Sequence, residues 1–305
     1  MTASPNQHSL RRQIRAALER YFVWKDRDSN LVLQSPETFE FDGRPEWIPD
    51  MLKRTALHDE DYRVFRFLTD PGETFLDIGA NYGYSAASVW ASGAKCAVLS
   101  FEPIVAFEPC LEAIERLRPG RYDYRIMGLG AVPGRARFAT PVVNSTALSA
   151  LTTAVSTLEA SERERMALDI EGFIDHHMGA TRDVTLRFFE FEAPVETLDN
   201  ALALERFRVP LDRVAAVKID TEGFESAVVK GAAETLRRHR PLMMVEHHGN
   251  SIPSLGQMLA DLGYFYAERD GDVLRPRARV GSCDNGFFVH RDRAAVYRAT
   301  GLLND

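Results

Sequence analysis

The sequence predicts an α/β protein built on a doubly wound, mostly parallel β-sheet. Two observations lead to this fold class. Short apolar segments alternate with amphipathic segments along much of the chain, and the first apolar segment runs directly into a glycine-rich turn. In sheets of this kind the ligand lies beyond the carboxyl ends of the strands. Acidic residues mark four of these ends: Asp77, Glu102, Asp220 and Glu246.

The expected elements follow in chain order. Residues 10–24 carry apolar residues at helical spacing, and residues 58–68 are expected to form a helix that Asp70-Pro71-Gly72 ends. An N-terminal helical extension is therefore expected over 1–70, followed by the main domain over 71–305. Strands are expected at 74–78, 95–101, 122–131, 214–219 and 241–245, and helices at 84–91, 106–117, 224–238 and 255–262. Residues 264–267 and 286–290 are expected to close the sheet as an antiparallel hairpin around a loop at 270–285.

Residues 141–192 interrupt the alternation of strands and helices. This segment is longer than an ordinary connection in a compact domain. It contains a helix-like stretch at 156–168, the pair His176-His177 and an aromatic, strand-like stretch at 185–191. Two interpretations stay open: a lid or cap that selects the substrate, or a surface excursion without a functional role.

Composition narrows the class of protein. The 305 residues are 45% hydrophobic, enough for a sizeable core, and the net charge of −7 disfavours a nucleic-acid partner. There is no run of about 18 apolar residues, so no membrane span is expected. The N-terminal segment lacks the features of a signal peptide, and Cys96, Cys110 and Cys283 lack ligand spacing. A cytoplasmic protein is expected, and the N-terminal helix makes a homodimer possible.

The turn after the first strand is Gly79-Ala80-Asn81-Tyr82-Gly83. Its glycines allow backbone N–H groups to approach a ligand at the start of the following helix. Asn81 replaces the middle glycine of the dinucleotide fingerprint, which disfavours a pyrophosphate. Asp77 before the glycines suits a ligand with an ammonium group, and this indicates S-adenosylmethionine (SAM). Glu102 follows Gly79 by 23 residues, near the separation at which an acid meets ribose hydroxyls.

Candidate catalytic residues come from the ends of the strands at 214–219 and 241–245. They are Asp220, Glu222, Glu246 and His247, with His248 as a neighbour whose side chain points to the opposite face. A carboxylate or imidazole here can remove a proton from a hydroxyl group. As an alternative, Asp220 and Glu246 with one histidine can hold a divalent cation. Structural roles are expected for Glu225, at the start of a helix, and for Lys218, as the partner of a buried acid.

Five segments together resemble the FkbM-type SAM-dependent methyltransferases: FLDIGANYG (75–83), SFEP (100–103), ETLDN (196–200), VKIDTEGFE (217–225) and KGAAETLRRHRPLMMVE (230–246). The resemblance implies the Rossmann-like fold of class I SAM-dependent methyltransferases. It also implies that SAM binds to Asp77, Gly79, Ala80, Asn81, Tyr82 and Gly83, with Glu102 on the ribose diol and Pro103 shaping the adjacent loop. Gly128 and Leu129 would approach the adenine. Thr221 departs from the family, which usually has an aliphatic residue there.

The resemblance implies an O-methyltransferase that acts on a hydroxyl of a small molecule such as a sugar or a polyketide. The acidic, proline-free segment Asp220–Gly223 suits an alcohol acceptor better than a nucleobase amine. One alternative is a binding or regulatory protein that has kept the SAM fold without its chemistry. Another is a nicotinamide-dependent oxidoreductase, which the residue at position 81 disfavours.

Overall fold

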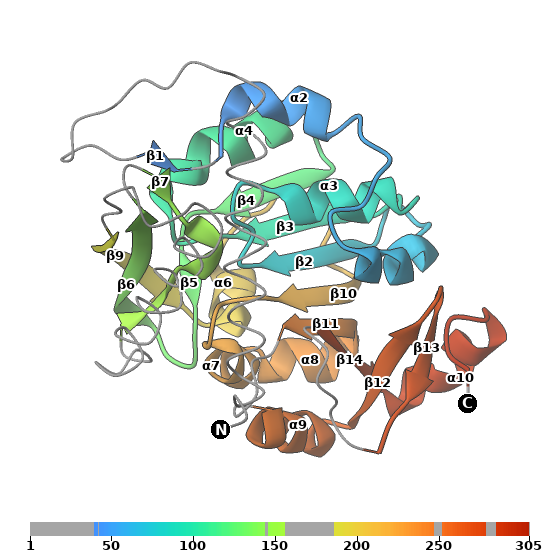
Figure 1. Cartoon of the computed structure of the whole chain (residues 1–305). Coiled ribbons are helices and arrows are strands. Elements are labelled where there is room, and N and C mark those ends of the chain that lie inside the picture. The colour runs from blue at the N-terminus through green and yellow to red at the C-terminus, as the bar shows by residue number, and fades with distance from the viewer. Residues whose placement is uncertain are drawn as a thin grey trace, which may run out of the picture. The chain divides into compact units, whose positions relative to one another are not determined.

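The computed structural model of the chain describes residues 40–41, 43–143, 146–155, 186–246, 252–278 and 285–304 (Figure 1). These residues belong to two compact units. The small unit falls within Met1–Asp42 and Ala136–Glu192, and the large unit comprises Gly43–Arg135 and Ala193–Asp305. The expected helix at 10–24 and the segment at 156–185, with His176 and His177, lie outside the described residues.

The large unit is built on an eight-stranded sheet with the order β13-β12-β14-β11-β10-β2-β3-β4. Its strands are β2 (Thr74–Ile78), β3 (Ala97–Phe101), β4 (Tyr122–Arg125), β10 (Val214–Ile219), β11 (Leu242–Glu246), β12 (Tyr264–Asp270), β13 (Val273–Pro276) and β14 (Asn285–His290). The neighbouring strands β11, β10, β2, β3 and β4 pair in parallel in this order. β14, β12 and β13 add three antiparallel pairings. The α/β class is confirmed, and the sheet as a whole is mixed.

The central strands are buried on both sides, because each contributes alternate residues to two apolar clusters. Phe75 and Leu76 of β2 belong to different clusters. The first cluster includes residues of η2 (Glu60–Phe67), α3 (Tyr84–Ala91), α4 (Glu108–Leu117) and α10 (Arg291–Ala299). The second includes residues of α6 (Leu198–Leu204), α7 (Glu225–Gly231), α8 (Ala233–His239) and α9 (Ile252–Asp261). This two-sided burial explains why the strands are short apolar runs with few polar residues.

Several expected elements differ from the structure. The expected strand at 122–131 is two strands, because the chain leaves the large sheet after Arg125 and β5 (Gly128–Leu129) pairs with residues 195–196 instead. The expected helix at 224–238 is divided into α7 and α8 at Ala232. A Cβ atom on Gly231 would lie 2.0 Å from the carbonyl oxygen of Gly130, so a glycine is needed for this close backbone approach.

The C-terminal residues 264–299 contain more regular secondary structure than the sequence indicated. The pairing of β12 with β14 confirms the antiparallel closure. The expected loop at 270–285 contains β13, which forms a hairpin with β12. The helix α10 was not expected. It packs Ala294 and Tyr297 into the first apolar cluster.

The small unit contains most of β6 (Gly134–Val143) and β9 (Leu186–Glu196). β6 lies between β9 and β7 (Thr146–Ala147), and the other described strands of the small unit are β1 (Glu40–Phe41) and β8 (Thr153–Ala154). Phe138 of β6 stacks on Phe191 of β9, with ring centroids 5.5 Å apart. The aromatic stretch expected to be strand-like is therefore part of a strand. The interpretation of 141–192 as a lid stays a prediction.

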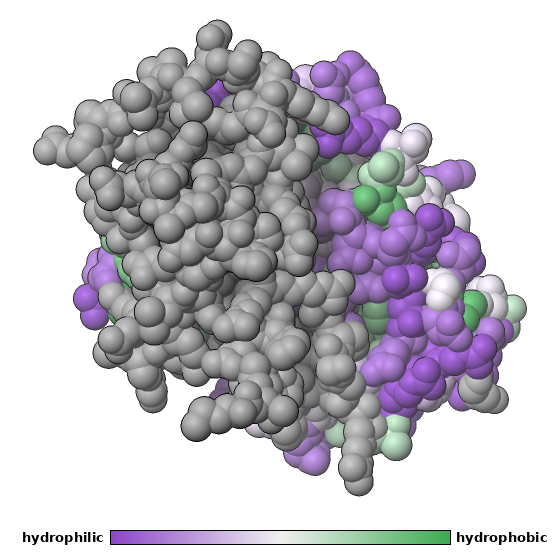
Figure 2. Space-filling view, viewed as in Figure 1, coloured by the Kyte–Doolittle hydropathy of each residue, from purple (hydrophilic) through white to green (hydrophobic). Residues whose placement is uncertain are grey.

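The described surface is largely hydrophilic on the face that Figure 2 shows, with hydrophobic residues scattered among polar ones. Exposed large hydrophobic side chains such as Val105, Leu204 and Val296 belong to separate elements. Among the described helices none has both the length and the apolar character needed to cross a membrane.

Candidate functional site

The turn between β2 and α3 has a backbone conformation that requires small residues. Gly79, Asn81 and Gly83 all have positive φ angles, of 81°, 53° and 94°. A Cβ atom on Gly79 would lie 1.7 Å from the carbonyl oxygen of Asp220, and one on Gly83 would lie 2.2 Å from Cδ1 of Ile114. The two glycines therefore allow the turn to lie against β10 on one side and α4 on the other.

Asn81 and Glu102 join this turn to the end of β3. The backbone N–H of Asn81 donates to Oε2 of Glu102 at 2.7 Å, and the N–H of Ile104 donates to Oε1 at 2.9 Å. The Asn81 side chain accepts from the N–H of Tyr82 at 2.8 Å, a local bond that stabilises an asparagine with positive φ. Burial raises the pKa of Glu102 to about 7, although the two N–H groups oppose this change. Pro103 follows, half-buried in the bend.

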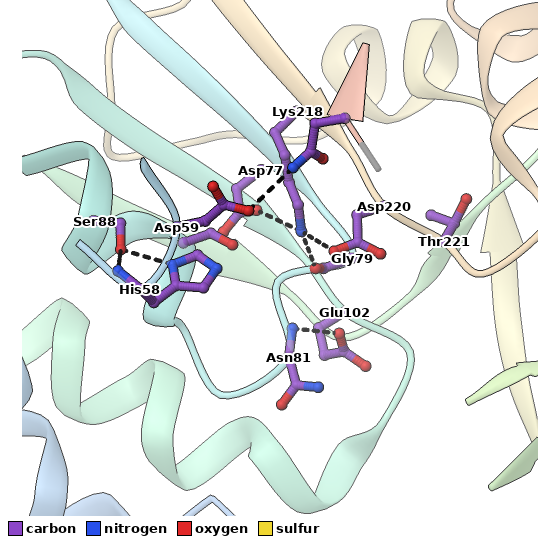
Figure 3. A network of polar contacts seen from close by, with 12 residues as sticks. His58, Asp59, Asp77, Gly79, Asn81, Ser88, Glu102, Lys218, Asp220 and Thr221 are labelled. Atoms are coloured by element: carbon purple, nitrogen blue, oxygen red, sulfur yellow. Dashed lines mark hydrogen bonds and ion pairs between the residues drawn. The ribbon is translucent and has the colours of Figure 1, made fainter. Parts of the chain in front are cut away.

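Asp77 lies beneath the turn, fully buried. Its Oδ2 accepts from the hydroxyl of Ser100 at 3.2 Å, and its Oδ1 lies 3.6 Å from the ammonium of Lys218. Burial raises the pKa of Asp77, and the charge of Lys218 opposes that effect. The expectation that Lys218 pairs with a buried acid is confirmed. Figure 3 shows that the Lys218 ammonium also meets the carbonyl oxygen of Gly79, at 2.7 Å, and Oδ2 of Asp220, at 3.1 Å.

Three of the four candidate catalytic residues meet at the carboxyl end of the sheet. Asp220, Glu222 and Glu246 each have a carboxylate oxygen within 4.8 Å of the others, and we call these three residues the acid cluster. Burial and the neighbouring charge of Asp220 raise the pKa of Glu246 well above its ordinary value. The arrangement can accept a proton or offer three oxygen donors to a hard cation. His247 and His248 lie outside the described residues.

The connection from β10 to α7 holds Glu222 in place. Glu222 has a φ angle of 51°, and Gly223 follows with 103°. Oε1 of Glu225 accepts from the N–H groups of Thr221 and Gly223 and from the Thr221 hydroxyl, all within 3.1 Å. Glu225 therefore has the structural role expected for an acid at the start of a helix. Thr221, the departure from the family pattern, uses its hydroxyl in this local network.

Gly128 and Leu129 form β5 and are held by their pairing with Val195 and Glu196. Both are buried. Their position depends on β9 and not on the glycine turn, so their assignment to an adenine site stays a prediction.

Two polar groups near the site were not found from the sequence. The ring of His58 contacts the hydroxyl of Ser88 through Nδ1, at 2.7 Å (Figure 3). The same ring lies edge-on to Tyr84. Asn285 pairs with Glu246 in the β11–β14 register, and its side chain donates to Asp61 at 3.1 Å. Both residues are distant in sequence from the motifs, so no local pattern could connect them to the site.

Comparison with known proteins identifies the family. A family model described as the methyltransferase FkbM domain matches residues 77–266, more than half of the 305 residues. The chain therefore belongs to the FkbM methyltransferase family, which confirms the resemblance noted in its motifs.

Two solved structures are similar to the chain. One is the methyltransferase FkbM from Methylobacillus flagellatus KT, with 14% identity and a TM-score of 0.41 over 80% of this chain. The chain covers 58% of that protein, less than two thirds of its length. The other is a precorrin-6y C5,15-methyltransferase from Geobacter metallireducens GS-15, with 11% identity and a TM-score of 0.33, covering 78% of this chain and 89% of that one. No curated protein matches the chain.

Proposed function

We propose that the protein is a SAM-dependent O-methyltransferase that acts on a hydroxyl group of a small molecule, with the sheet arrangement of class I SAM-dependent methyltransferases. One observation supports this proposal above the others. In a chain of the FkbM methyltransferase family, the glycine turn and the acid cluster lie at the same edge of the sheet and contact one ammonium group, that of Lys218.

The turn has the features that a SAM site requires. Gly79, Asn81 and Gly83 have positive φ angles, and Gly79 and Gly83 leave no room for a Cβ atom, so the backbone of the turn is not covered by side chains at these two glycines. We assign Gly79, Ala80, Asn81, Tyr82 and Gly83 to the cofactor, with Asp77 supporting them from below. The Glu102 carboxylate offers acceptor oxygens for the two ribose hydroxyls, and Pro103, Gly128 and Leu129 complete the proposed set. When bound, SAM supplies the electrophilic methyl group.

The acid cluster supplies the proton chemistry. A hydroxyl oxygen that forms a bond to the methyl carbon must lose its proton, and a carboxylate within hydrogen-bond distance can accept it. Glu246 is our first candidate for this base, because the high pKa that burial and Asp220 produce makes its ionised form a stronger base than an exposed glutamate. Asp220, Glu222 and His247 would orient the acceptor or share the proton.

A divalent cation is an alternative way to stabilise the acceptor oxygen. Asp220, Glu222 and Glu246 provide three carboxylates, the ligand type that Mg²⁺ and Mn²⁺ prefer. Treatment with EDTA separates the two mechanisms: turnover that needs a cation is lost and returns with added Mg²⁺, whereas turnover by a carboxylate base does not change.

The proposal is tested with the purified chain in two steps. Calorimetry with S-adenosylhomocysteine (SAH) should show binding, and NAD should show none. Transfer of radiolabelled methyl from SAM is then measured with a panel of sugars, polyols and phenols. Binding of NAD in place of SAH would contradict the proposal, and SAH binding without transfer to any acceptor would favour a regulatory protein.

The role of Glu246 is tested with the acceptor that this panel identifies. Glu246→Gln should lower turnover by about 100-fold or more, the effect of a lost general base, and leave the SAH dissociation constant nearly unchanged. The matched control Glu112→Gln changes an exposed glutamate on α4 and should change neither quantity. A parallel loss of turnover and SAH binding in Glu246→Gln would show that Glu246 is structural.

A further inference from the structure

The ammonium group of Lys218 lies at the carboxyl ends of the parallel strands, between the glycine turn (residues 79–83) and the acid cluster. It lies on β10 between β2 and β11, and its side chain is only 3% exposed. Burial lowers the pKa of its ammonium, but the charges of Asp220 and Asp77 and the hydroxyls of Tyr62 and Tyr84 more than compensate and raise the pKa well above its ordinary value. Lys218 therefore stays protonated, as a buried ammonium does only when it is well paired.

The contacts of this ammonium belong to two different parts of the proposed site. Gly79, whose carbonyl oxygen accepts at 2.7 Å, is the first residue of the turn that we assign to SAM. Asp220, at 3.1 Å, belongs to the acid cluster. Asp77 forms a third contact at 3.6 Å, from below. A movement of either the turn or Asp220 changes the surroundings of the same charge.

The charged and titratable groups around Lys218 come from several neighbouring strands and helices. They are Tyr62 of η2, Asp77 of β2, Tyr84 of α3, Glu102 after β3, Asp220 after β10 and Glu246 of β11. Each of these six groups is neutral or negatively charged, whereas Lys218 is positively charged. Its charge favours the ionised form of both Glu102 and Glu246.

We propose that Lys218 is a positioning residue that holds the Gly79 carbonyl and the Asp220 carboxylate in one arrangement and thereby couples the SAM turn to the acid cluster. This inference rests on the proposed function. Lys218 itself takes no proton from the acceptor and forms no bond to the transferred group. Its role is to fix the distance between the two halves of the site and to balance the charge of the cluster.

The first test uses the unmodified protein. The chain has five lysines: Lys25, Lys53, Lys95, Lys218 and Lys230. With ¹⁵N-labelled lysine, the NMR spectrum has at most five side-chain ammonium signals. Single Lys→Arg changes at the other four positions assign their signals, and the remaining signal is that of Lys218. Saturation with SAH should shift the Lys218 Nζ signal and leave that of the exposed Lys230 unchanged. An unchanged Lys218 signal in the SAH complex would overturn the proposal.

The second test removes the charge. Lys218→Met should weaken SAH binding by about tenfold or more, as expected for the loss of a charged hydrogen bond. It should also lower kcat at saturating SAM and acceptor by about tenfold or more, because Asp220 is no longer held beside the turn. The matched control Lys230→Met should change neither result. A kcat that does not fall in folded Lys218→Met would contradict the proposal.

These results separate this inference from the proposed function. If the wild-type protein does not bind SAH, the proposed function fails; if it binds SAH and folded Lys218→Met keeps its SAH affinity and kcat, only the coupling by Lys218 fails. If Lys218→Met does not fold, the SAH-induced shift of the Lys218 signal in the wild-type protein decides the coupling. A merely structural lysine would lower stability without changing kcat at saturating SAM and acceptor.

Discussion

At the scale of single residues, Gly79 shows how closely the two halves of the site approach. Its positive φ angle of 81° already disfavours any other residue, and a Cβ atom would overlap the carbonyl oxygen of Asp220. The same backbone contact that brings Asp220 near the turn therefore excludes a side chain at position 79. Both the stability of the fold and the geometry of the site therefore depend on the absence of a Cβ atom at position 79.

Gly79→Ala should destabilise the large unit by more than the φ angle alone explains. The matched control is Gly120→Ala, because Gly120 has a φ angle of 70° with open space around its Cβ position. The control should lose about 1–2 kcal/mol, the usual cost of a left-handed residue. Urea unfolding measures both variants. Equal losses of unfolding free energy in the two variants would show that the turn can move away from Asp220 at little energetic cost.

Glu102 makes stability depend on pH. Its pKa rises from an ordinary 4.5 to about 7 through burial, so the folded protein holds this proton more tightly than the unfolded chain. The contribution of Glu102 to the free energy of unfolding therefore falls as the pH rises from about 4.5 to about 7, by roughly 3 kcal/mol.

Glu102→Gln removes this titration. The free energy of unfolding of the variant minus that of the wild-type protein should therefore increase by up to roughly 3 kcal/mol between pH 4.5 and pH 8. This increase does not depend on the value of the difference at pH 4.5. Urea unfolding of the ligand-free proteins at several pH values measures this. Parallel pH profiles for the two proteins would contradict the assignment of a raised pKa to Glu102.

At the scale of helices and strands, the ETLDN segment has a structural role. Asp199 accepts from the N–H groups of Glu234, at 2.9 Å, and Thr235, at 2.8 Å, and from the Thr235 hydroxyl. These N–H groups lie in the first turn of α8, where a helix has no internal acceptors for them. An acid of α6 thus caps a helix that follows it by more than thirty residues.

Asp199→Ala should lower the free energy of unfolding by about 1–2 kcal/mol, the usual effect of a lost helix cap. Asp199→Asn keeps a side-chain oxygen as acceptor and should lose less. Neither change should alter the SAH dissociation constant, because Asp199 lies in a helix-to-helix contact away from the glycine turn. A loss of SAH affinity in the folded Asp199→Ala protein would contradict this structural role.

At the scale of the whole molecule, the large unit connects the site to both apolar clusters. β2 and β10 carry Asp77 and Lys218, and the same strands bury residues such as Phe75, Leu76 and Val217 on the two faces of the sheet. A ligand bound at the strand ends therefore stabilises an element that both clusters share.

SAH at about 100 times its dissociation constant should add roughly 2.7 kcal/mol to the stability of the protein. For a domain of this size that corresponds to an increase of about 5–10 °C in the melting temperature. Differential scanning calorimetry measures it, with NAD as the control. An equal increase with NAD would show that the site does not distinguish the two ligands.

Much of the fold and part of the site could be predicted from local sequence patterns. The buried strands, the helix at 84–91 and the glycine turn each have a signature within about ten residues, because side-chain period and backbone conformation are local properties. The lysine within an apolar strand was enough to predict a buried ion pair for Lys218. The split of the helix at Ala232 has no local signature, and the adjacent Gly231 closely approaches Gly130, a residue distant in sequence.

The sequence by itself determined the α/β class, the family and which residue types stand at the strand ends. Only the tertiary structure decided that Asp220, Glu222 and Glu246 meet, that Lys218 reaches Gly79, that His58 lies nearby and that Asn285 pairs with Glu246. The physical reason is that these contacts join residues up to more than two hundred positions apart, such as Asp61 and Asn285. Their distances depend on strand order and packing, which no local pattern contains.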